Sequence, residues 1–240
     1  MKTVLITGVS RRLGLFLTES FLLSNKNTKV IALTRKTNDA LEKLEKTGNL
    51  QIIEVDYSSI NSLSQAVTEV RSQNKTLDLI VHNASRFEKD ALHANDPWAY
   101  YDSLYQVHMK MPAYLNENLF ELLKNRDKPG CIIHITDISV ENPYPEFTLY
   151  CSTKAGLENM TKSYAKKFSP YVRVNSILPG PIQFLPSHTS AEKEKINNQT
   201  LLDVEPGFLP ILKGIQFIFD NQFVTGSSIK IDGGRSITKL

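Results

Sequence analysis

The sequence predicts an α/β fold, a Rossmann-type doubly wound parallel sheet of about seven strands with helices on both faces. Two observations predict it. Short apolar runs alternate with amphipathic stretches along the 240 residues, which is the pattern of repeated βαβ units with right-handed crossovers. A glycine-containing turn also joins the first apolar run directly to the first amphipathic stretch. The length fits one domain spanning residues 1–240.

The first half of the chain supplies four strands. The apolar run Val4–Ile6 stops at Thr7 and Gly8, as a buried parallel strand does, and apolar residues at helical spacing follow it. The same alternation continues to the middle of the chain. We expect strands at 4–6, 30–33, 52–55 and 77–81, with helices at 13–23, 39–46 and 60–71 between them.

The second half repeats the pattern with longer helices. We expect helices at 98–124, 147–168 and 211–219, and strands at 131–135, 172–177 and 228–231. One segment, 179–206, does not follow the alternation of strands and helices, because it is rich in proline and carries a polar run from Ser190 to Gln199. Irregular segments that leave strand ends border the ligand crevice of such sheets, so we interpret this one as a substrate loop or lid; a plain surface excursion is the alternative.

Composition excludes several classes of protein. The chain is 41% hydrophobic and 22% charged, as ordinary globular proteins are, and its net charge of +3 is too small to indicate nucleic acid binding. No apolar run is long enough for a signal peptide or a membrane span. Two cysteines, Cys131 and Cys151, give neither a metal-binding spacing nor a disulfide framework. We therefore expect a cytoplasmic protein with no metal site.

The turn from Thr7 to Gly14 is a candidate phosphate site. Glycines here allow a tight turn and let a pyrophosphate approach the positive end of the following helix. The three-glycine fingerprint is incomplete, because Arg12 occupies the place of the middle glycine. The candidate cofactor-binding residues of the turn are Gly8, Ser10, Arg11, Arg12, Leu13 and Gly14.

The end of the second strand predicts which cofactor is bound. An acidic residue there would bond a free ribose 2′-hydroxyl, whereas a basic residue accommodates a 2′-phosphate. Here Thr34 is followed by Arg35, which favours NADPH, with Arg11 and Arg35 as the phosphate ligands and Thr34 assisting. Two solvated surface arginines are the alternative. Asp56, after the third strand, could accept a hydrogen bond from the adenine amine or merely begin a helix.

Tyr150 and Lys154 stand four residues apart on a predicted helix and so project from one face. An ammonium group beside a phenol lowers the phenol's pKa, which suits a proton donor near neutral pH. Asp137 lies thirteen residues before Tyr150, and its charge would oppose that effect and keep the tyrosine protonated. Taken alone, Asp137 could instead cap the segment that follows it.

Together these motifs resemble the short-chain dehydrogenase/reductase family over almost the whole chain. The matching stretches are the glycine turn, His82-Asn83-Ala84-Ser85, the Tyr150 and Lys154 pair, Pro179-Gly180 and Asp232-Gly233-Gly234. Arg12 in the turn, serine at position 85 and Asp137 in place of the usual serine look like the pteridine reductase branch, and most like the bacterial dihydromonapterin reductases. The resemblance implies NADPH-dependent reduction of a dihydropterin, such as 7,8-dihydromonapterin or 7,8-dihydrofolate, to its tetrahydro form.

The resemblance also assigns roles to single residues. It implies Tyr150, Lys154 and Asp137 as catalytic residues and Arg12, Ser85, Phe87, Asp137 and Tyr150 as substrate-binding residues, with Phe87 stacking on the pterin. It adds Asn83, Ala84, Tyr150, Lys154, Pro179, Gly180 and Ile182 to the cofactor site. His108 replaces an asparagine that takes part in the family's proton relay, and it could keep that relay, titrate itself or be structural. A homotetramer is implied, in which Lys239 could reach a neighbouring site.

An ionised carboxylate accepts hydrogen bonds and cannot donate them, so Asp137 suits the N–H-rich edge of a pterin better than a ketone. Two alternatives stay open. A short-chain reductase of carbonyls or 3-oxoacyl thioesters would normally keep a serine at position 137. A non-catalytic NADP(H)-binding regulatory protein would agree with the incomplete glycine pattern and His108, but Tyr150 and Lys154 count against it.

Overall fold

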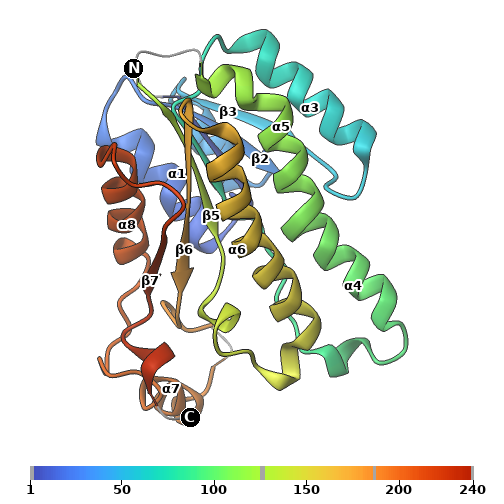
Figure 1. Ribbon diagram of the computed structural model, residues 1–240, viewed down its shortest axis with the longest axis vertical. Helices are drawn as coiled ribbons and strands as arrows, with labels where there is room; N and C mark the ends of the chain where they lie inside the picture. Colours follow the sequence, from blue (N-terminus) through green and yellow to red (C-terminus); the bar gives the residue numbers. More distant parts are fainter. Residues whose placement is uncertain (1–2, 125–127, 186–187, 239–240) are drawn as a thin grey trace.

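The computed structural model describes residues 3–124, 128–185 and 188–238, and it confirms the predicted fold class (Figure 1). Seven parallel strands form one sheet in the order β3-β2-β1-β4-β5-β6-β7. The strands are β1 (Thr3–Thr7), β2 (Lys29–Thr34), β3 (Leu50–Glu54), β4 (Leu79–His82), β5 (Gly130–Ile135), β6 (Val172–Pro179) and β7 (Ser228–Ile231). Strand order reverses between β1 and β4, which places a crevice at their carboxyl ends.

Helices cover both faces of the sheet. They are α1 (Arg12–Ser24), α2 (Asp39–Glu45), α3 (Ile60–Gln73), α4 (Pro97–Tyr105), α5 (Met111–Lys124), α6 (Thr148–Phe168), α7 (Ser190–Asn197) and α8 (Leu209–Asp220). Short 3₁₀ turns occur at Asp90–His93, Ile138–Val140, Pro145–Phe147 and Arg235–Ile237. Buried side chains of α3, α5 and α6 pack on one face, and those of α1, α2 and α8 on the other. No helix within the described ranges is long and apolar enough to cross a membrane.

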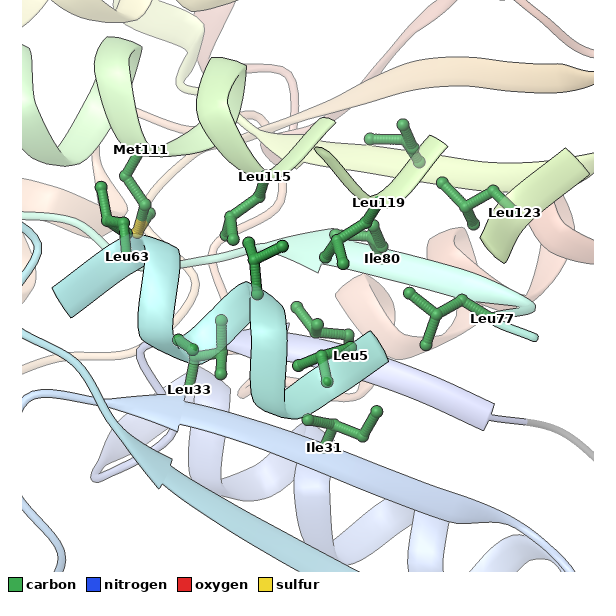
Figure 2. Close-up of a cluster of buried hydrophobic side chains, with 14 of the residues drawn as sticks. Leu5, Ile31, Leu33, Leu63, Leu77, Ile80, Met111, Leu115, Leu119 and Leu123 are labelled. Carbon is green, nitrogen blue, oxygen red and sulfur yellow. The ribbon is translucent and has the colours of Figure 1, made fainter. Parts of the chain in front are cut away.

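The α5 helix shows how the pattern of apolar residues builds the core. Its buried residues recur at helical spacing and pack in one cluster with side chains of the sheet and of α3 (Figure 2). The labelled side chains of this cluster are Leu5, Ile31, Leu33, Leu63, Leu77, Ile80, Met111, Leu115, Leu119 and Leu123. Burying one such side chain contributes about 1.5–3 kcal/mol, so this cluster stabilises the packing of α3 and α5 on the sheet.

Two predicted segments need correction. The helix expected at 98–124 is interrupted by a π-helical segment, Gln106–Lys110, which separates α4 from α5 and contains His108. The polar run in 179–206 is partly helical: α7 begins after Thr189, whose side chain forms a reciprocal capping box with Glu192. The sequence pattern missed α7 because the helix buries no residue and so lacks an apolar face.

Candidate active site

The glycine turn is tied to the end of β4. Thr7 Oγ1 accepts hydrogen bonds from the backbone N–H groups of Asn83 and Ala84 at 3.1 and 3.0 Å. The Asn83 amide donates to the carbonyls of Thr7 and Gly8 at 3.1 and 3.0 Å. Asn83, expected beside the nicotinamide, therefore holds the two strand ends together through its Nδ2.

The turn leaves room for an anion at the start of α1. Gly8 has φ +73°, and a Cβ there would lie 2.6 Å from Ala84 Cα; a Cβ at Gly14 would lie 2.0 Å from the Gly8 carbonyl oxygen. Arg11 precedes the helix and forms no side-chain cap, so the first N–H groups of α1 are open to a ligand. Leu13 is buried beneath them. This arrangement fits a dinucleotide pyrophosphate.

Arg12 has the left-handed conformation that usually favours glycine, with φ +51°. Its guanidinium donates to the carbonyl oxygens of Gln183 and Phe184 at 2.9 and 3.4 Å, and it lies 5.8 Å from the centre of the Phe208 ring. Arg12 thus connects the glycine turn to segment 179–206. That segment begins close to the site, although its residues 186–187 lie outside the described ranges.

The end of β2 carries the predicted 2′-phosphate site. Arg35 is exposed there, whereas Thr34 is buried and its hydroxyl donates to the Lys36 carbonyl at 3.0 Å. Asp56 is also exposed, and hydrogen bonds from Ser58, together with the nearby Arg35, lower the pKa of its carboxyl group. The structure therefore leaves the Arg35 side chain accessible to solvent, whereas the Thr34 hydroxyl is engaged by the backbone. Ser10 adds a backbone link, because its carbonyl accepts from Asn38 Nδ2 at 2.7 Å.

The three predicted catalytic residues meet at the carboxyl ends of β5 and the start of α6. Tyr150 Oη donates to Asp137 Oδ2 at 2.8 Å, and Asp137 Oδ1 accepts from the Ser139 N–H at 2.7 Å. Asp137 therefore caps the next turn and also contacts the phenol. Lys154 Nζ donates to the Ile135 carbonyl at 2.9 Å and lies 5.7 Å from the centre of the Tyr150 ring.

The expected lowering of the Tyr150 pKa by Lys154 is wrong. Burial raises the pKa of Tyr150 well above 10, and the charge and hydrogen bond of Asp137 raise it further. Burial also lowers the pKa of Lys154 to about 8, although Asp137 opposes this shift. The prediction that Asp137 keeps the tyrosine protonated agrees with these directions, so the Tyr150 hydroxyl carries its proton over the neutral range.

Two phenylalanine rings pack next to Tyr150. The ring of Phe87 lies parallel to that of Phe147, with centroids 4.4 Å apart, and meets Tyr150 edge-on at 4.8 Å. Phe87 is 52% exposed, so part of this residue can contact a flat ligand. Phe147 was missed from the sequence, where it only begins a helix; no motif marks it.

His108 is fully buried beside the same tyrosine. Its Nε2 lies 2.9 Å from Ser85 Oγ and its Nδ1 lies 2.8 Å from Thr153 Oγ1, and its ring meets Tyr150 edge-on at 5.4 Å. Burial, and then the charge of Lys154, hold the pKa of His108 well below 6.5. Its contact with Ser85 could not be predicted from spacing, because the π-helical segment sets where the side chain points.

The remaining predicted cofactor residues lie at the end of β6. Pro179 closes that strand, and Gly180 N donates to the Ile231 carbonyl at 3.0 Å. A Cβ on Gly180 would lie 2.7 Å from Asp232 Cα, so the two motifs approach backbone to backbone. Ile182 packs against the same core cluster as the buried residues of α1.

Two further expectations concern other parts of the chain. Lys239 lies outside the described residues. Within the described ranges, no group of side chains is suited to hold a metal ion.

Fold and site together define a nucleotide-binding oxidoreductase, and comparison with known proteins identifies the family. The family of short chain dehydrogenases, represented by its sequence profile, matches residues 2–195. The chain belongs to this family. Dihydromonapterin reductases of Enterobacter sp. (strain 638) and Klebsiella pneumoniae are 34% identical over 239 residues, covering 98% of this chain and 97% of theirs.

Solved structures are similar over the whole chain. A 4-hydroxyisoleucine dehydrogenase complexed with NADH superposes with a TM-score of 0.90 at 26% identity and covers 100% of both chains. The alternative dihydrofolate reductase FolM of Brucella suis, in complex with NADP, has a TM-score of 0.85 at 26% identity and covers 99% of this chain and 96% of its own. These two similar structures therefore hold different nicotinamide cofactors, NADH in one and NADP in the other.

Proposed function

We propose that this protein reduces a 7,8-dihydropterin, such as 7,8-dihydromonapterin or 7,8-dihydrofolate, to the tetrahydro form with NADPH. The observation that carries the proposal is the hydrogen bond from Tyr150 Oη to Asp137 Oδ2 at 2.8 Å, beside the half-exposed ring of Phe87. A phenol, an acceptor-only carboxylate and an aromatic ring are therefore neighbours, which supports proton donation to a flat substrate that offers N–H groups.

Asp137 supports a pterin over a carbonyl substrate. A serine at this position could donate a hydrogen bond to a carbonyl oxygen, whereas a carboxylate only accepts. The amino-pyrimidine edge of a pterin offers N–H donors that match it. Hydrogen bonds to a charged group contribute about 1.5–3 kcal/mol, which suffices to select one substrate class over another.

NADPH, when bound, supplies the hydride that reduces the substrate carbon. The glycine turn and the open N–H groups of α1 would hold its pyrophosphate, and Arg11 and Arg35 its 2′-phosphate. Tyr150, which stays protonated through burial and Asp137, would hold the proton that the substrate nitrogen receives. Phe87 would orient the flat ring, because an aromatic partner fixes both distance and tilt.

The comparisons support the proposal but leave the substrate open. The relatives named dihydromonapterin reductase match over nearly full length, and FolM is named for dihydrofolate reduction. The 4-hydroxyisoleucine dehydrogenase binds NADH, so the basic end of β2 rather than overall similarity supports NADPH.

One assay separates the candidate functions. NADPH oxidation is followed with 7,8-dihydromonapterin, 7,8-dihydrofolate and a 3-oxoacyl thioester as alternative substrates. Turnover of a dihydropterin is expected. Turnover of the thioester alone would indicate the carbonyl reductase, and NADPH binding without turnover of any of them would indicate a regulatory protein.

The matching variant is Tyr150→Phe, which removes only the proton donor. We expect kcat to fall roughly 10²–10⁴-fold, the usual contribution of general acid catalysis, with NADPH affinity nearly unchanged. The affinity for NADPH is measured by fluorescence titration. Loss of binding without loss of kcat would show that Tyr150 holds the cofactor instead.

A further inference from the structure

The hydrogen bonds around His108 determine which of its nitrogens carries the proton. Thr153 Oγ1 donates its only proton to the Tyr150 carbonyl at 2.8 Å, so it must accept from His108 Nδ1–H. The Arg86 backbone N–H points at His108 Nε2 at 3.4 Å, so that nitrogen must be an acceptor. Both constraints select the neutral Nδ1–H tautomer, which agrees with the complete burial of the ring.

This tautomer fixes the direction of the Ser85 hydroxyl. Since Nε2 carries no proton, the contact of 2.9 Å between Ser85 Oγ and His108 Nε2 requires the serine to donate. A serine hydroxyl has one proton and two lone pairs. Its lone pairs are then all that Ser85 can offer to a ligand.

Ser85 and Asp137 occupy equivalent places at the ends of neighbouring strands. His82 of β4 pairs in register with His134 of β5. Ser85 and Asp137 each follow by three residues, at the carboxyl edge of the sheet. Two hydrogen-bond acceptors therefore border the site on adjacent strands.

We infer that His108 is a positioning residue that holds the Ser85 hydroxyl proton, so that Ser85 and Asp137 together select substrate N–H donors. The inference rests on the proposed function and extends it. A pterin edge with its amino group and ring N–H offers two donors to two acceptors. A carbonyl oxygen would instead meet lone pairs at both positions, which disfavours the carbonyl reductase reaction.

The test is a double-mutant cycle between Ser85 and His108. In His108→Asn, the shorter amide can still reach Thr153, but no atom takes the place of Nε2 and the serine proton is released. We expect KM for 7,8-dihydromonapterin to rise about tenfold, the loss of one well-placed hydrogen bond, with kcat within about threefold. His108→Gln places an amide oxygen near Nε2 and should restore KM to within about threefold.

The cycle distinguishes positioning from mere structural support. In a Ser85→Ala background, His108→Asn should no longer change KM, because it acts through the serine. An equal rise in both backgrounds would overturn the inference. A dihydropterin analogue without the 2-amino group gives a second readout: wild type should prefer the amino form, and Ser85→Ala should reduce that preference about tenfold.

Failures of the two proposals remain distinguishable. Absence of turnover of any dihydropterin by the wild-type protein contradicts the proposed function. If the wild-type protein turns over a dihydropterin but the Ser85→Ala and His108→Asn substitutions change KM additively, only the role of His108 is contradicted. NADPH titration establishes that each variant is folded, and if His108→Asn does not fold, an unchanged analogue preference in Ser85→Ala overturns the inference by itself.

Discussion

At the scale of single residues, Asp137 has a dual role that the sequence presented as two alternatives. One carboxylate oxygen caps the Ile138–Val140 turn and the other accepts from Tyr150. The cap holds the carboxylate in place, so that its second oxygen is positioned to accept from the phenol. Burial, and then the charge and hydrogen bond of Asp137, raise the pKa of Tyr150, which the spacing to Lys154 alone did not predict.

Asp137→Asn removes the charge but keeps an acceptor. We expect kcat/KM for a dihydropterin to fall roughly 10–100-fold, because a hydrogen bond to a charged group is lost. Asp137 raises the pKa of both Tyr150 and Lys154, so both pKa values should fall when its charge is removed, and the alkaline limb of the pH–rate profile should move to lower pH. Glu141→Gln, which removes a carboxylate paired with Lys230, is the control. An unmoved alkaline limb in Asp137→Asn would contradict this account.

Arg35→Ala tests the choice of cofactor. Arg35 is exposed at the end of β2, where a 2′-phosphate would lie. We expect the ratio of kcat/KM for NADPH to that for NADH to fall about tenfold or more, because the KM for NADPH rises. Lys36→Ala, next along the chain, is the matched control for loss of a positive charge. If the ratio stays constant in Arg35→Ala, then Arg35 does not contact the phosphate.

At the scale of elements, the sequence pattern predicted every strand, most directly the central ones, β1, β4 and β5, which are continuous buried apolar runs between turns. Two local features escaped it. The π-helical segment at 106–110 arises from backbone hydrogen bonding that apolar spacing does not encode, and α7 has no buried face. The motifs placed Tyr150, Lys154 and Asp137 correctly together, whereas Phe147 and the contacts of His108 depend on how separate elements pack.

A chain of buried polar groups joins four elements behind the site. His82 of β4 contacts Asn116 of α5 at 2.8 Å, Asn116 contacts His134 of β5 at 3.2 Å, and His134 contacts Thr161 of α6 at 2.8 Å. Burial lowers the pKa of His82 to about 4, and burial together with the charges of His82 and Lys154 holds that of His134 well below 6.5. Both histidines are therefore neutral in the folded protein at neutral pH.

This network should make the fold sensitive to acid. The unfolded chain binds a proton at each histidine below about pH 6.5, whereas the folded state does not, so stability falls as the pH decreases. His82 alone should cost roughly 3 kcal/mol between about pH 6.5 and 4. Urea unfolding at fixed protein concentration over this range measures the loss. His82→Gln, which keeps a donor for Asn116, should flatten the curve; parallel curves for the two proteins would contradict it.

At the scale of the whole molecule, the sheet leaves one edge open at β7 (Figure 1). Residues along β7 alternate between exposed and half-buried, and an outer strand edge with unpaired backbone groups favours association. Large apolar side chains lie exposed nearby: Phe217 on α8 is 54% exposed and Phe223, before β7, is fully exposed. From these features we propose that copies of this chain associate through α8 and β7, within the homotetramer that the family resemblance implies.

Phe223→Asp tests this assembly directly. In the proposed interface a charge at position 223 would lose apolar buried area and would have to be desolvated, so the variant should form a smaller assembly than wild type at the same concentration. Size-exclusion chromatography with light scattering gives the mass of each species. Ile60→Asp is the control, because Ile60 is also exposed but begins α3, beside the opposite edge of the sheet, where an acidic residue is favourable. If both variants keep the wild-type mass, the α8 and β7 edge is not an interface; if Phe223→Asp alone dissociates while keeping NADPH binding, the open edge is where copies of this chain meet.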